Sequence, residues 1–131
     1  KEFSTQIKAL SGSDGVDVIY DAVGGDYAQP AVRSLAWKGR YLVVGFPAGI
    51  PSIPLNLTLL KGCQIVGVFW GAHTVREPQN HAENMGDLFR LYREGKIKPR
   101  ISANYPLDKA GDALQLLQDR KVLGKVVVTM D

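Results

Sequence analysis

Glycine-containing turns follow two strand-like stretches of the sequence, at points where the backbone could approach a ligand closely. Residues 16–21 are followed by Ala22-Val-Gly-Gly25, and the apolar run 41–44 is followed by Gly45. Glycine has no Cβ atom, so the chain can turn tightly there and lie against another group. Ligands of open α/β sheets bind outside the carboxyl ends of the strands, so segments 22–25 and 45–48 are expected to form one lip of a cleft.

Other reactive side chains are few, namely one cysteine and two histidines. Cys63 lies in an apolar run, which favours a buried structural thiol over a nucleophile. A single cysteine excludes an internal disulfide and a cysteine-cluster zinc site, and it is in keeping with a cytoplasmic location. His73 and His81 have no partner at metal-ligand spacing, so no metal site is predicted and no residue is assigned a catalytic role.

Helices alternating with strands must position the glycine turns. The predicted helices are 1–10, 26–37, a short turn 56–60, 76–94 and a helix from 106 through Leu117, and the predicted strands are 16–21, 40–46, 64–70, 101–105 and 124–129. Asp26, Asn56 and Asp108 are expected to cap their helices, and Gly39 and Gly95 to end the helices before them. This alternation predicts the α/β class with a doubly wound, mostly parallel sheet.

Composition limits the classes of partner. The chain has 131 residues, of which 45% are hydrophobic and 22% charged, as in ordinary globular domains. No apolar run approaches the roughly 18 residues that span a bilayer, so no membrane association is expected. The net charge of +3 does not indicate nucleic acid. The basic run at residues 90–100 has two interpretations, a solvated helix end and a phosphate-binding patch.

Four motifs, in order, resemble the zinc-free quinone oxidoreductase branch of the medium-chain dehydrogenase/reductase superfamily, which includes zeta-crystallin-like proteins. They are similar to the fourth, fifth and sixth Rossmann strands and to the C-terminal signature of that family, and they read Val16-Asp-Val-Ile-Tyr-Asp-Ala-Val-Gly-Gly25, Gly39-Arg-Tyr-Leu-Val-Val-Gly-Phe46, Gly67-Val-Phe-Trp-Gly71, and Leu107-Asp-Lys-Ala-Gly-Asp-Ala-Leu114 with Gly124-Lys-Val-Val-Val128. The resemblance covers nearly the whole chain.

The resemblance implies an NADPH-dependent reductase of quinones or other activated alkenes, with a Rossmann domain beside a catalytic domain related to GroES. It implies a homodimer, and because the edge strand of a sheet often pairs with another subunit, the strand from Cys63 to Val68 is expected to pair with its two-fold mate. The positions that it places near the cofactor are Ala22, Val23, Gly24, Gly45, Phe46, Phe69, Trp70, Gly71, Gly124 and Lys125.

One family feature is missing from the sequence, the Gly-x-Gly-x-x-Gly loop whose backbone N–H groups hold the pyrophosphate. The chain is therefore expected to be a C-terminal part, with residues 1–97 from the rear of the Rossmann domain and residues 98–131 a β-α-β segment that returns toward a catalytic domain. By itself it is expected to be inactive. Two alternatives stay open, a non-catalytic binding or dimerisation module and an enoyl reductase module.

Overall fold

The computed structural model describes residues 2–12 and 14–130, and these form two compact units divided between Arg76 and Glu77. Each unit is described by itself. The predicted domain boundary after residue 97 concerns a complete enzyme and stays a prediction.

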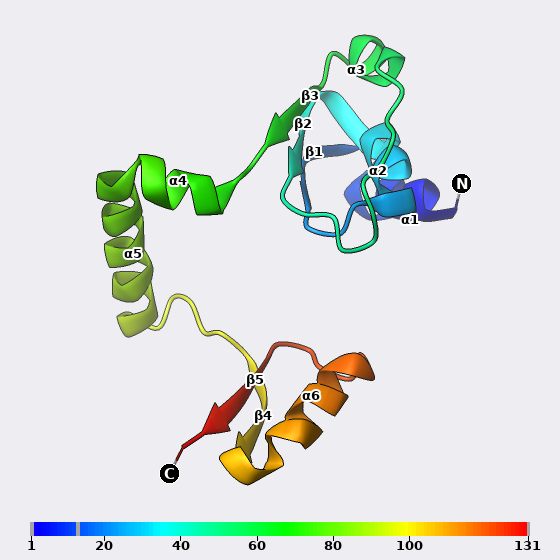
Figure 1. Ribbon diagram of the computed structural model, residues 1–131. Helices are drawn as coiled ribbons and strands as arrows, with labels where there is room; N and C mark the ends of the chain where they lie inside the picture. The colour runs from blue at the N-terminus through cyan, green and yellow to red at the C-terminus, as the bar shows by residue number, and fades with distance from the viewer. Residues whose placement is uncertain (1, 13, 131) are drawn as a thin grey trace. The chain divides into compact units, whose positions relative to one another are not determined.

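The first unit is a three-stranded parallel sheet with helices packed against it (Figure 1). Its elements are α1 (Glu2–Ser11), β1 (Val16–Asp21), η1 (Gly25–Tyr27), α2 (Ala28–Ser34), β2 (Leu35–Val43), α3 (Asn56–Lys61), β3 (Gln64–Gly67) and α4 (Trp70–Arg76). The strand order is β1-β2-β3, and both pairings are parallel. The predicted parallel α/β architecture is confirmed.

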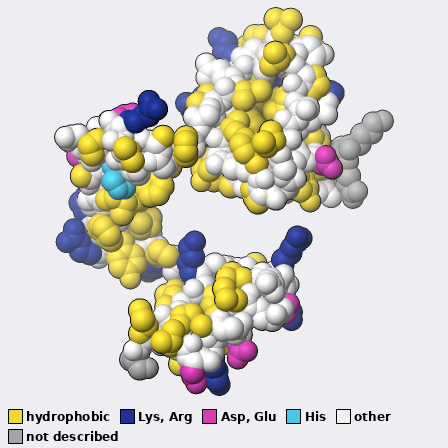
Figure 2. All heavy atoms as spheres, in the orientation of Figure 1, with side chains coloured by type: hydrophobic (Ala, Val, Ile, Leu, Met, Phe, Trp, Pro, Cys, Tyr) yellow, Lys and Arg dark blue, Asp and Glu magenta, His cyan; other side chains and the backbone are white. Residues whose placement is uncertain are grey.

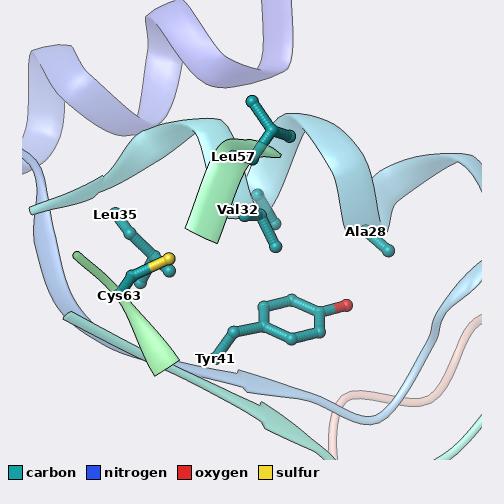
Figure 3. Close-up of a cluster of buried hydrophobic side chains, with 7 residues drawn as sticks. Ala28, Val32, Leu35, Tyr41, Leu57 and Cys63 are labelled. Carbon is teal, nitrogen blue, oxygen red and sulfur yellow. The ribbon is translucent and has the colours of Figure 1, made fainter. Parts of the chain in front are cut away.

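The core of this unit lies between the sheet and helices α2 and α3. Its buried side chains are Ala28, Ala31, Val32, Leu35, Tyr41, Leu57 and Cys63. Figure 3 shows the Tyr41 ring between the strands and the helix that carries Ala28 and Val32. The prediction that Cys63 is buried is confirmed.

The end of the second helix differs from its prediction. Helix α2 stops at Ser34, and Leu35 is already extended, with φ −60° and ψ 144°. Tertiary packing explains this, because Leu35 is buried and the backbone at 34–36 lies directly against Gly15. The left-handed residue is Lys38, with φ 63°, rather than the predicted Gly39.

Strands β2 and β3 end earlier than predicted. The N–H of Val44 donates to the Asp21 carbonyl at 2.9 Å, which completes the parallel pairing of Asp21 with Val43, and β2 stops at Val43. The N–H of Val68 donates to the Val43 carbonyl at 2.8 Å, which completes the pairing of Val43 with Gly67, and β3 ends at Gly67. Trp70 then begins α4 instead of ending a strand.

The predicted helix 76–94 is also shorter, because Pro78 opens α5 (Pro78–Arg93) and separates it from α4. Proline has no N–H and disfavours a helical conformation in the preceding residue, and Glu77 has φ −130°. Gly95 follows the helix with φ 69°, which confirms its predicted role. Asp26, Asn56 and Asp108 were wrongly predicted as caps: all three lie inside their elements and no side-chain cap bond forms.

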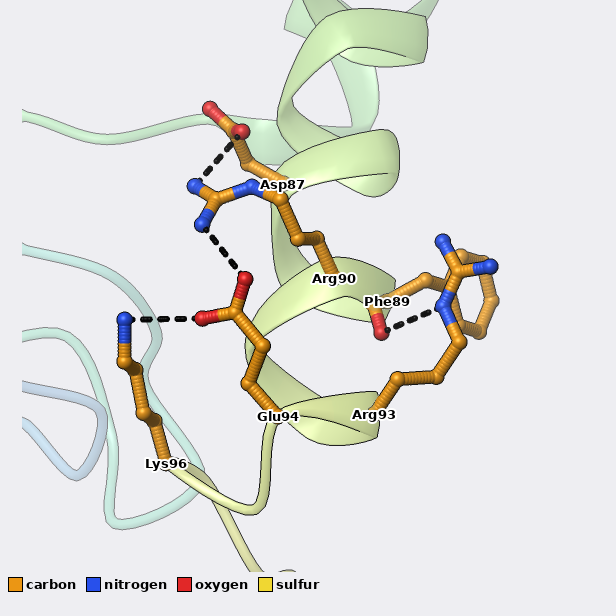
Figure 4. A network of polar contacts seen from close by, with 6 residues as sticks. All are labelled: Asp87, Phe89, Arg90, Arg93, Glu94 and Lys96. Atoms are coloured by element: carbon orange, nitrogen blue, oxygen red, sulfur yellow. Dashed lines mark hydrogen bonds and ion pairs between the residues drawn. The ribbon is translucent and has the colours of Figure 1, made fainter.

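The second unit contains α5 and a β-α-β segment. This segment comprises β4 (Ile101–Pro106), η2 (Leu107–Lys109), α6 (Ala110–Gln118) and β5 (Lys125–Thr129), with β4 and β5 paired in parallel. Carboxylates neutralise part of the basic run, since Arg90 lies 3.1 Å from Asp87 and 3.2 Å from Glu94, and Lys96 lies 2.7 Å from Glu94 (Figure 4). These exposed pairs favour a solvated helix end over a phosphate-binding patch.

Candidate functional site

The carboxyl ends of β1 and β2 bring the two predicted glycine segments together. The N–H of Ala48 donates to the Val23 carbonyl at 3.0 Å, and the N–H of Gly25 donates to the Gly49 carbonyl at 2.7 Å. The loop after β1 and the loop after β2 therefore form one continuous lip at the ligand-binding edge of the sheet.

Glycine is required twice in the first of these loops. Gly24 has φ 71°, and a Cβ atom there would lie 2.8 Å from the Gly49 carbonyl oxygen. Gly25 has φ 58°, and its Cβ atom would lie 2.5 Å from the Ala48 carbonyl oxygen. Both clashes involve backbone atoms, so the close approach of the two loops depends on these residues.

Gly45 differs from them. Its backbone is in an ordinary conformation, and the nearest atom to a Cβ there would be the Ala22 carbonyl oxygen, at 3.5 Å. The surrounding protein atoms therefore leave room for a side chain at position 45, and Gly45 lines a pocket.

This pocket, of about 390 Å³, lies at the carboxyl ends of β2 and β3 and is mostly apolar. It is lined by Val43, Val44, Gly45, Phe46, Gly67, Val68 and Phe69. Phe46 is 44% exposed and Phe69 is 79% exposed. Figure 2 shows hydrophobic side chains gathered on the visible face of this unit.

The remaining predicted positions are placed differently. Trp70 and Gly71 follow Phe69 directly, in the first turn of α4, and both are exposed. Gly124 and Lys125 belong to the second unit, where the N–H of Lys125 donates to the Arg100 carbonyl at 2.8 Å. A Cβ at Gly124 would lie 2.4 Å from that same oxygen, so local packing by itself requires glycine there.

A buried pair of side chains, Asp21 and Tyr41, is bonded to the first loop of the lip. The sequence alone assigned no role to either residue. Asp21, at the end of β1, is 9% exposed, and Tyr41, in β2, is 1% exposed. The Asp21 carboxylate accepts hydrogen bonds from the N–H groups of Val23, at 2.8 Å, and Gly24, at 2.9 Å, and from the Tyr41 hydroxyl.

These contacts move both pKa values. Burial by itself would raise the pKa of Asp21, but the hydrogen bonds from Tyr41, Gly24 and Val23 outweigh it, and the pKa lies below its ordinary value. Burial, the hydrogen bond to Asp21 and the charge of Asp21 all raise the pKa of the Tyr41 hydroxyl. Asp21 is thus a carboxylate at neutral pH, and Tyr41 is its donor.

Part of this arrangement has a signal in the sequence. An aspartate followed by a glycine turn commonly bonds the N–H groups two and three residues ahead. Tyr41 carries no such signal, because it is far from Asp21 in the sequence and comes next to it only when β1 pairs with β2.

Among residues 2–12 and 14–130, no group of three or more His, Cys, Asp or Glu side chains is placed to hold a metal ion. Within the same part of the chain, every helix is too short or too polar to cross a membrane.

Comparison with known proteins gives consistent matches. The family described as zinc-binding dehydrogenase matches residues 2–128. A quinone oxidoreductase-like protein 2 homolog of Nematostella vectensis is 42% identical over 125 residues, which are 94% of this chain and 34% of that protein. The chain thus spans about a third of the length of this relative.

Solved structures agree in fold. A probable oxidoreductase of Mycobacterium abscessus superposes with a TM-score of 0.80 at 32% identity, over 99% of this chain and 38% of the other. The JamJ enoyl reductase superposes with a TM-score of 0.80 at 26% identity, over 99% of this chain and 39% of the other. With the parallel sheet and its glycine lip, these matches show that the chain belongs to the quinone oxidoreductase-like branch of the medium-chain dehydrogenase/reductase superfamily.

Proposed function

We propose that the chain provides the nicotinamide side of the cofactor site in an NADPH-dependent oxidoreductase that reduces quinones or other activated alkenes. The observation that carries this proposal is the apolar pocket beside the joined glycine loops, at the carboxyl edge of the parallel sheet. A pocket of about 390 Å³ is within the range of small-molecule sites, and its apolar walls suit a flat ring.

The predicted residues have separate tasks in this proposal. Ala22, Val23 and Gly24 form the lip against which the ribose lies, and Gly45 leaves the space for the ring. Phe46 and Phe69 cover the ring and exclude water. The bound cofactor supplies the hydride, and these residues supply position and shielding.

Trp70, Gly71, Gly124 and Lys125 are proposed as further cofactor contacts in a complete enzyme. The proposed homodimer pairs β3 with its two-fold mate, because β3 is an edge strand of the described sheet and the side chains of Ile65 and Val66 are partly exposed. The preference for NADPH, the zinc-free character and the cytoplasmic location also remain predictions.

A second candidate is an enoyl reductase, favoured by the similarity to the JamJ enzyme. It places the same hydride chemistry at the same pocket and differs in the electron-poor alkene that accepts the hydride. Parallel assays of a complete enzyme with a quinone and with an enoyl thioester separate the two.

The proposal is tested on this chain with reduced nicotinamide mononucleotide, which lacks the adenosine half and so needs no pyrophosphate loop. We expect saturable amide chemical-shift changes at Ala22–Gly24, Gly45 and Phe46, and none there with ADP. Gly45→Ala should weaken this binding without loss of stability, because only the pocket, and not the fold, is crowded by its Cβ atom.

Gly86→Ala, in α5, is the matched control, since a Cβ there meets nothing within 4 Å. It should leave binding unchanged. Absence of shift changes at the lip, or equal weakening by both substitutions, would overturn the proposal.

A further inference from the structure

Asp21 holds both loops of the lip at once. Its side chain accepts the N–H groups of Val23 and Gly24, which fixes the loop after β1. Its backbone carbonyl accepts the N–H of Val44 at 2.9 Å and that of Gly45 at 3.4 Å, which fixes the start of the loop after β2. Asp21 is therefore bonded to both segments, in addition to the two backbone bonds that join the loops directly.

Tyr41 fixes the orientation of that carboxylate. Its hydroxyl donates to Oδ2, while the two backbone amides donate to Oδ1. The carboxylate consequently cannot rotate without breaking a bond to β2 or to the loop. All three donors are uncharged. Asp21 also lines a separate pocket beside β1, where the other ionisable side chains are Tyr20 and Tyr27.

A buried carboxylate adds little net stability, because the cost of its desolvation opposes the gain from its hydrogen bonds. What it does provide here is geometry, since its oxygens join a loop to a neighbouring strand. Neither Asp21 nor Tyr41 lines the pocket between Phe46 and Phe69.

We propose that Asp21 and Tyr41 are positioning residues, which hold the two loops at the spacing that binds the nicotinamide end of the cofactor without touching it. This inference rests on the proposed function.

The arrangement also restricts the chemistry of the ligand at this lip. Anion-binding loops present unpaired backbone N–H groups. Here the N–H groups of Val23 and Gly24 are bonded to the carboxylate, that of Gly25 is bonded to Gly49, and a negative charge lies beneath them. The lip therefore suits an uncharged or cationic group, such as the nicotinamide ring with its ribose, rather than the 5′-phosphate that the mononucleotide also carries.

The test compares Tyr41→Phe with Ser34→Ala in the full chain. Each substitution removes one buried hydroxyl that donates a hydrogen bond, but the Ser34 hydroxyl bonds to the Ala31 carbonyl within α2, at 2.7 Å. We expect Tyr41→Phe to raise the Kd for reduced nicotinamide mononucleotide roughly tenfold, the equivalent of one lost bond to a charged group. Ser34→Ala should leave the Kd unchanged.

Amide hydrogen exchange gives a readout that needs no ligand. Exchange at Val23, Gly24 and Gly45 should accelerate in Tyr41→Phe and keep its wild-type rate in Ser34→Ala. Asp21→Asn, which keeps one acceptor oxygen, should lie between wild type and Asp21→Ala in both readouts.

The outcomes separate the two proposals. If wild type does not bind the mononucleotide, the proposed function fails, and the exchange rates still decide whether the pair positions the loops. If Tyr41→Phe resembles Ser34→Ala in exchange, or in Kd where wild type binds, the positioning role is overturned.

Discussion

Gly24→Ala is the substitution that should damage the lip most directly. Gly24 has φ 71° and ψ −145°, a region that only glycine populates readily. Placing alanine there costs about 1–3 kcal/mol in backbone strain. Its Cβ atom would also lie 2.8 Å from the Gly49 carbonyl oxygen, which accepts the bond from Gly25 N–H. Loss of that bond adds about 1 kcal/mol, so we expect the free energy of unfolding to fall by about 2–4 kcal/mol in total.

Urea unfolding followed by tryptophan fluorescence measures this loss. The chain has two tryptophans, Trp37 and Trp70, and both belong to the first unit, so the signal reports that unit alone. Gly45→Ala is the matched control, with an expected change within about 0.5 kcal/mol because its Cβ atom meets nothing closer than 3.5 Å. Equal midpoints for the two variants would refute the reasoning that close backbone approach at Gly24 holds the loops together.

Three further predictions concern ionisation and assembly. Because the folded-state pKa of Asp21 is lowered, its stabilisation is present above the ordinary pKa of aspartate and is lost as pH falls through the lowered value. Tyr41→Phe removes one of the lowering bonds, so acid unfolding followed by circular dichroism should shift to higher pH, and an unchanged midpoint would contradict this. Because the pKa of Tyr41 is raised, its contribution is complete below the ordinary pKa of tyrosine and is lost above it. The part of the tyrosinate absorbance that Tyr41→Phe removes should therefore develop above that ordinary pKa, and its development at the ordinary pKa would contradict this. Sedimentation should detect a dimer that Ile65→Lys, within the edge strand β3, weakens, whereas a wild-type monomer at all concentrations would argue against pairing through this strand.

The alternation of helices and strands could be predicted from the sequence because apolar spacing decides it. The failures occur where tertiary contacts or a single residue act against the local pattern. Leu35 continues a helical spacing, but it is buried and pairs with Val16 of β1, so it begins β2. Pro78 makes the long helix begin at residue 78 instead of the predicted 76, an effect that the apolar periodicity does not show.

The site shows the same division between local and distant information. Gly24 and Gly45 are visible in the sequence because glycine after a strand is a local signal. The bond between Asp21 and Tyr41 is not visible, since it depends on the register that pairs Ile19 with Tyr41 and so puts Asp21 on the same face of the sheet, one pleat further along. A pattern of single residues cannot specify that register.

The most direct test of the central claim is an intermolecular nuclear Overhauser measurement on this chain with reduced nicotinamide mononucleotide. The nicotinamide ring protons should show contacts to the rings of Phe46 and Phe69, which line the same pocket. They should show none to Tyr27, which lines the separate pocket beside β1. Contacts to Tyr27 without contacts to Phe46 or Phe69, or no contacts at saturating ligand, would contradict a nicotinamide site at the ends of β2 and β3.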